Sequence, residues 1–166
     1  MDTSTINAME AGSARKVFET CCQQAHWAHQ MTLGRPYPSG EELLAQARKL
    51  WEELTESDIL EVIDSHPAIG SGGTGFSRVE QQRTSEAPQS VLDQLKMLNQ
   101  IYRSKFGFVF LICAKGKDAS EIIDSLRSRL GNSREEEIKK ASEEIQKINE
   151  QRLLEILNNK KTRRDT

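Results

Sequence analysis

Four side chains able to move protons or to bind polar ligands stand close together in the sequence, near the middle of the chain. His66 is followed directly by Pro67, and Ser77, Glu80 and Gln81 come after a glycine-rich stretch. An imidazole titrates near neutral pH and can act as a general acid or base. Because proline disfavours helix for the residue before it, we expect His66 at a helix end, held in a stiff turn. A histidine that only caps backbone carbonyls is the structural alternative.

The spacing of Ser77, Glu80 and Gln81 places all three on one face of a helical turn. A carboxylate beside an imidazole orients the ring and raises its pKa, which favours proton transfer. Ser77 and Glu80 also fit a capping box at the start of a helix, but that alternative leaves Gln81 unexplained. The pattern therefore predicts a polar site beside His66.

Two further features could complete a pocket. Residues 106–114 form an apolar run whose irregular backbone could offer N–H and C=O groups to a flat ligand, although plain core is the common role of such a run. Arg152 is the next member of an apolar stripe formed by Ile138, Ala141, Ile145 and Ile148. A guanidinium in that stripe is costly unless it meets a carboxylate or an anion, or unless its stem lets the head reach water.

Two other constellations carry less weight. Cys22, His26 and His29 fall on one face of a predicted helix, but no fourth zinc ligand is visible. Cys113 could be a nucleophile, yet its apolar surroundings raise a thiol pKa and make it inert packing. The sequence therefore predicts a site without metal, and a zinc-dependent hydrolase is the weakest alternative.

The composition limits the classes of protein that fit. The chain has 166 residues, a formal net charge of −2 and 29 % charged residues, so no global field would draw it to nucleic acid or to a membrane surface. Three cysteines without metal spacing argue against a disulfide framework. Neither a signal peptide nor a membrane span is recognised. We therefore expect a soluble intracellular protein.

Helical periodicity predicts an all-α fold, a single-domain bundle of roughly six to eight helices. Residues 1–12 are predicted to be a disordered lead, 13–158 the helical domain, and 159–166 a charged tail or linker. A single helix is expected over Ser13–Met31, and the run 106–114 is expected as a buried extended turn or a helix start. Capping residues are expected at the starts of four helices, at Ser39, Ser57, Asp118 and Ser133.

Four motifs occur in one order along the chain: His-Pro-Ala-Ile-Gly, Ser-Arg-Val-Glu-Gln, Lys-Phe-Gly-Phe-Val-Phe-Leu-Ile-Cys-Ala and Ile-Asn-Glu-Gln-Arg-Leu. Together they resemble the 2-oxo-4-hydroxy-4-carboxy-5-ureidoimidazoline (OHCU) decarboxylases, from about Ala14 to Leu157. The resemblance implies an all-α, usually homodimeric enzyme without metal or organic cofactor. It would convert the last oxidised intermediate of urate degradation to (S)-allantoin and CO2. A non-catalytic helical interaction module is the main alternative.

The same resemblance implies roles for particular residues. His66 and Glu80 match the catalytic positions. Contacts with a small ureide substrate are implied for Pro67, Ser77, Gln81, Phe110, Leu111, Ile112, Cys113, Ala114 and Arg152. The resemblance also implies a peroxisomal or cytoplasmic location, and fusion or functional coupling to a 5-hydroxyisourate hydrolase.

Overall fold

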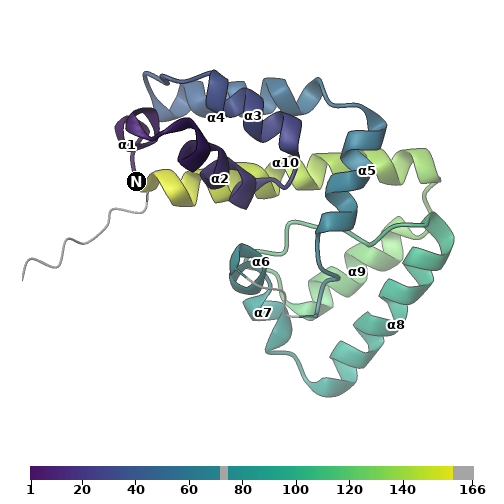
Figure 1. Ribbon diagram of the computed structural model, residues 1–166. Coiled ribbons are helices and arrows are strands. Elements are labelled where there is room, and N and C mark those ends of the chain that lie inside the picture. Colours follow the sequence, from purple (N-terminus) through teal and green to yellow (C-terminus); the bar gives the residue numbers. More distant parts are fainter. Residues whose placement is uncertain (72–74, 159–166) are drawn as a thin grey trace, which may run out of the picture. The chain divides into compact units, whose positions relative to one another are not determined.

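The computed structural model describes residues 1–71 and 75–158, and every regular element in that part of the chain is a helix (Figure 1). The predicted all-α class is confirmed. Ten helices are described rather than six to eight, because residues 1–12 include a helix and the predicted helix over Ser13–Met31 is divided into two. The helices are α1 (Thr3–Ala8), α2 (Ala11–Cys21), α3 (Ala25–Leu33), α4 (Gly40–Glu52), α5 (Glu56–Ser65), α6 (Gly75–Glu80), α7 (Gln82–Ser85), α8 (Gln89–Phe106), α9 (Ala119–Arg129) and α10 (Arg134–Asn158).

The chain forms two compact units. One consists of Met1–Asp58 with Gln146–Thr166, and the other of Ile59–Ile145. Helix α10 contributes its first half to the second unit and its second half to the first. The charged tail predicted over 159–166 lies outside the described residues. Among the described helices, none has the length and apolar character needed to cross a membrane.

The N-terminal residues 1–12 are not a disordered lead, so that prediction is wrong. Ile6 of α1 is 1 % exposed. Asn7 exchanges two hydrogen bonds with the backbone of Tyr37, and the Arg35 guanidinium donates to two carbonyls at the end of α1. These partners are distant in sequence. A short helix that depends on them leaves no periodic signal of its own.

The predicted helix over Ser13–Met31 is two helices. Cys22 adopts an extended conformation after α2, and Gln24 caps α3 by accepting a hydrogen bond from the Trp27 N–H at 2.6 Å. The break lets α2 and α3 pack on each other. The rings of Phe18 and Trp27 meet edge to face, with their centroids 6.2 Å apart. Apolar residues cover much of the surface of the helix predicted over Ser13–Met31, and one straight helix could not bury them all.

In the second unit, α8 and α9 pack against each other (Figure 1). Helix α8 ends at Gly107, whose φ of 83° is left-handed and favours glycine. The chain then runs without regular structure through 108–114, and most of its side chains are buried. Of the two alternatives for residues 106–114, the buried non-helical segment is therefore observed over 108–114, whereas Phe106 is the last residue of α8. The Tyr102 ring packs edge-on against Phe108 and Phe110 and fixes the start of this segment.

Candidate active site

His66 follows the last residue of α5, at the helix end where the sequence predicts it. Its Nδ1 lies 2.8 Å from the carbonyl oxygen of Val62. Because a carbonyl can only accept, Nδ1 carries the hydrogen, and in the neutral ring Nε2 then carries the lone pair. The capping contact that was the structural alternative is thus present. The same contact sets the tautomer and the orientation that a base at Nε2 requires.

Gln81 fixes the loop that follows His66 and Pro67. Its side chain is 3 % exposed, and Oε1 accepts a hydrogen bond from the Gly70 N–H at 3.0 Å. Gly70 has a φ of 91°, and an added Cβ would lie 3.1 Å from Cδ2 of Leu95. The loop therefore needs glycine here for its backbone conformation. Gln81, a predicted site residue, thus holds the loop that directly follows two other predicted site residues, His66 and Pro67.

Ser77 lies inside α6 rather than at its N-cap, and its carbonyl accepts the backbone N–H of Gln81 at 3.0 Å. The capping-box alternative therefore does not describe Ser77. Glu80, the last residue of α6, interacts electrostatically with Cys113. Burial raises the pKa of the Cys113 thiol, and the charges of Glu144 and Glu80 add to this effect. This raised pKa agrees with the prediction that Cys113 is not a nucleophile.

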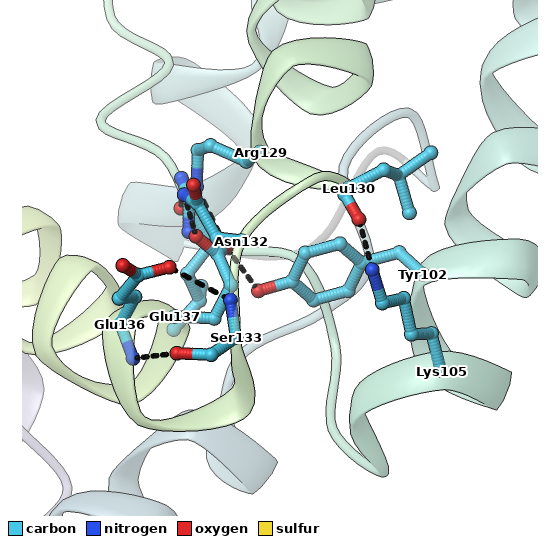
Figure 2. A network of polar contacts seen from close by, with 9 residues as sticks. Tyr102, Lys105, Arg129, Leu130, Asn132, Ser133, Glu136 and Glu137 are labelled. Carbon is cyan, nitrogen blue, oxygen red and sulfur yellow. Dashed lines mark hydrogen bonds and ion pairs between the residues drawn. The ribbon is translucent and has the colours of Figure 1, made fainter.

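A buried carboxylate organises the region behind the 108–114 segment (Figure 2). Glu137 is 0 % exposed and accepts from three donors: the Tyr102 hydroxyl at 2.6 Å, Arg129 Nε at 2.8 Å and Asn132 Nδ2 at 2.9 Å. Burial, and next the hydrogen bond to Glu137, raise the pKa of Tyr102, so its hydroxyl stays protonated as a donor. A charge this deeply buried is tolerated only when it is paired and hydrogen-bonded in this way.

Arg129 connects this cluster to the predicted substrate wall. Its Nη1 donates to the Leu111 carbonyl at 2.6 Å, and its Cζ lies 4.5 Å from the centre of the Phe110 ring. A planar guanidinium can make all these contacts at once, which an ammonium cannot. The backbone of the 110–114 stretch is therefore held at Leu111 by an arginine that belongs to a buried ion pair.

Arg152 is buried in the first unit. It is 7 % exposed, and its Nη1 donates to the Cys21 carbonyl at 3.1 Å, at the C-terminal end of α2. A cation there meets the negative end of the helix dipole. Snorkelling to water is therefore not how this guanidinium is accommodated. His66 and Glu80 belong to the second unit, so their convergence with Arg152 stays a prediction.

The zinc alternative required Cys22, His26 and His29 to share one face of a helix, which they do not. Cys22 lies beyond the end of α2 and is buried, whereas His26 and His29 are exposed on α3. The break at Cys22 separates the thiol from the imidazoles. Within residues 1–71 and 75–158, no group of three or more candidate metal ligands is found.

The Cys22 thiol yields a testable pH dependence. Burial raises its pKa from 9.0 to about 12, against smaller opposing effects of Asn149 and Arg152. The folded thiol keeps its proton where the unfolded thiol loses it. Stability should therefore fall as pH rises above 9.0, by up to ~1.4 kcal/mol per pH unit from this group. Urea unfolding at a series of alkaline pH values measures the slope.

Cys22→Ala is the matched variant. It removes the titrating group while Tyr37, whose pKa burial also raises to about 12, is retained. The variant should be less stable at neutral pH because a buried atom is lost. Its stability should nevertheless decline less steeply in alkali. If the free energy of unfolding falls with pH as steeply in Cys22→Ala as in the unaltered chain, the Cys22 thiol does not have a raised pKa.

Comparison with known proteins shows that most of this chain matches one protein family. A family model described as OHCU decarboxylase matches residues 7–154. This chain belongs to the OHCU decarboxylase family. The matched region includes His66, Glu80, the 110–114 stretch and Arg152.

Named relatives and a solved structure of the family agree with this assignment. The Arabidopsis thaliana "Uric acid degradation bifunctional protein TTL" is 34 % identical over 92 % of this chain, which spans 49 % of that protein. The Xenopus laevis 2-oxo-4-hydroxy-4-carboxy-5-ureidoimidazoline decarboxylase is 29 % identical, with 97 % of each chain covered. A crystal structure of OHCU decarboxylase in the presence of (S)-allantoin has a TM-score of 0.77 and 29 % identity, covering 90 % of this chain and 99 % of that chain.

Sequence reasoning missed the residues that support the site of this family member. Glu137, Glu144 and Arg129 are all buried, at 0 %, 7 % and 6 % exposure. Glu137 and Glu144 are seven positions apart in α10 and lie beside its apolar stripe, a spacing that could have marked them. Arg129 gave no such signal, because its partners Leu111 and Glu137 come from other segments.

Proposed function

We propose that this chain catalyses the decarboxylation of OHCU to (S)-allantoin and CO2 in urate degradation. The observation that carries the proposal is the similarity to an OHCU decarboxylase over nearly the full length of that protein, whose crystal structure was solved in the presence of (S)-allantoin. The chain spans about half of the Arabidopsis relative and about a third of a bifunctional uric acid degradation protein from Bacillus sp. TB-90. The proposal concerns the decarboxylase activity alone.

The chemistry of this substrate suits a site made only of side chains and backbone. Its carboxylate is on a carbon next to a C=N bond. When the bond to the carboxylate breaks and CO2 leaves, the electron pair can move into that C=N bond, so no cofactor is needed as an electron sink. The protein has to orient the carboxylate and ureido groups, exclude water, and deliver a proton to one face of the enol-like intermediate.

We assign the proton transfer to His66, acting through Nε2 because Nδ1 is engaged by the Val62 carbonyl. Glu80 orients the imidazole and the substrate, and its electrostatic interaction with Cys113 supports a place beside the substrate wall. Arg152 binds the anionic part of the substrate. The remaining contacts are assigned to Pro67, Ser77, Gln81, Phe110, Leu111, Ile112, Cys113 and Ala114.

Partners and location are further parts of this proposal. Several relatives are named as bifunctional uric acid degradation proteins. We propose that this chain works together with a 5-hydroxyisourate hydrolase activity, as a homodimer, in the peroxisome or the cytoplasm. Sedimentation of the purified chain measures its oligomeric state.

A coupled assay tests the activity. Fresh urate is treated with urate oxidase and a 5-hydroxyisourate hydrolase, with and without this chain, and circular dichroism follows the product. With the chain, the absorbance of the intermediate should disappear faster and an (S)-allantoin signal should develop. Equal rates and an optically inactive product in both reactions would refute the proposal.

A further inference from the structure

A cavity lies beside the loop that follows His66 and Pro67. It has a volume of about 620 Å3, within the range of pockets that bind small organic molecules. Its walls are residues 68–71, one face of α8, and Val109 with Phe110. Apart from Phe110, none of the residues assigned to the decarboxylase site lines it.

Two cations of α8 face this cavity. Lys96 and Arg103 are seven residues apart, which places them about 10 Å apart along the helix axis. Neither side chain makes a hydrogen bond or ion pair with another described residue. Asp93 also lines the cavity, but it accepts a hydrogen bond from Gln89 at 2.9 Å and lies on the far side of Lys96 from Arg103. The Arg103 end of the cavity therefore favours an anion.

Four apolar side chains also line the cavity: Ile69, Leu92, Val109 and Phe110. Asn99 Nδ2 donates to the Ile69 carbonyl at 2.9 Å, which ties the loop to α8. The other atom of that amide, Oδ1, is buried and accepts no hydrogen bond from any described residue. A buried acceptor of this kind lacks a donor that a ligand N–H group could supply after a small rotation of the amide.

From these features we infer that the cavity is a second ligand site, which takes a small organic anion with a flat apolar body and an amide-type N–H group. The anionic group lies between Lys96 and Arg103, the apolar body lies against Ile69 and Phe110, and the N–H group faces Asn99. A ligand bound there contacts residues 68–71, the loop that follows the proposed catalytic histidine. This site is independent of the proposed decarboxylase activity.

Hippurate is a suitable probe because it has a phenyl ring, an amide N–H and a carboxylate. Calorimetric titration of the full chain should give saturable binding that weakens as salt is raised. Arg103→Gln should weaken it by about fivefold, the size expected for one partly exposed ion pair. Hippurate methyl ester lacks the negative charge. Its affinity for the unaltered chain should be no higher than the affinity of hippurate for the Arg103→Gln variant. Benzoate, which lacks the N–H group, should bind more weakly than hippurate.

Two control variants locate the binding. Arg127→Gln removes an exposed cation of α9 that does not line the cavity, and Glu80→Gln alters the proposed catalytic site. Both should bind hippurate as the unaltered chain does. Absence of saturable binding, equal binding of the ester, an unchanged affinity in Arg103→Gln, or loss of binding in Glu80→Gln would each overturn the inference. All these readings are independent of turnover, so failure of the decarboxylase proposal would leave them intact.

Discussion

Replacing His66 with asparagine should lower the rate of stereospecific allantoin formation by about a hundredfold or more, the usual contribution of a positioned acid or base. The side-chain amide of asparagine can place an N–H donor where Nδ1 now contacts the Val62 carbonyl. The variant therefore keeps the helix-capping contact but has no nitrogen at the Nε2 position. The coupled assay and urea unfolding of the same preparation measure both consequences.

The two roles of His66 give opposite results in this variant. If His66 only caps α5, the asparagine variant keeps both stability and activity, and the histidine leaves the mechanism. If it moves a proton, activity is lost while the free energy of unfolding stays close to that of the unaltered chain. Glu80→Gln should also lose activity, because an amide cannot supply the negative charge that orients the imidazole. His66→Ala would lose the capping contact as well and is the less informative variant.

Replacing Glu137 with glutamine should destabilise the chain by about 3 to 5 kcal/mol, the typical cost of breaking a buried ion pair from one side. Arg129 is 6 % exposed and would keep its charge without the carboxylate. The new amide also brings an N–H group towards Asn132, which already donates at this position. Thermal and urea unfolding measure the loss.

Glu136→Gln is a matched control from the adjacent position. Glu136 is exposed and accepts the Ser133 N–H in a capping box, where glutamine is also accepted. This variant should stay within about 0.5 kcal/mol of the unaltered chain, as surface substitutions usually do. If the Glu137 and Glu136 variants are equally stable, the buried pair does not hold the 110–114 segment. The double variant Arg129→Met with Glu137→Leu should recover much of the loss, because it leaves no unpaired charge.

Local signals in the sequence predicted much of the fold. The capping box of Asp118 with Glu121 is present at the start of α9, and Ser133 with Glu136 forms the reciprocal pair at the start of α10. The end of α5 at the His-Pro step and the irregular segment after Gly107 were also predicted. Each depends on neighbours within a few residues, which the sequence displays directly.

Features that depend on distant partners were not predictable in the same way. Helix α1 depends on Arg35 and Tyr37, and the break between α2 and α3 depends on packing between the two helices. The cluster around Glu137 joins residues from three separate segments. The proposed site residues were inferred from motifs, whereas buried side chains that contact them, such as Arg129, carry no motif. Their roles depend on the packed structure alone.

The division of α10 between the two compact units has a consequence for the order in which the protein is made. The second unit is continuous in sequence, from Ile59 to Ile145, so all of its residues have been synthesised before the chain is finished. The first unit begins at the N-terminus but also needs the residues from Gln146 onward, among them Arg152, which bonds to the end of α2. Helices α1 to α4 therefore cannot complete the core of their unit until the second half of α10 has been synthesised.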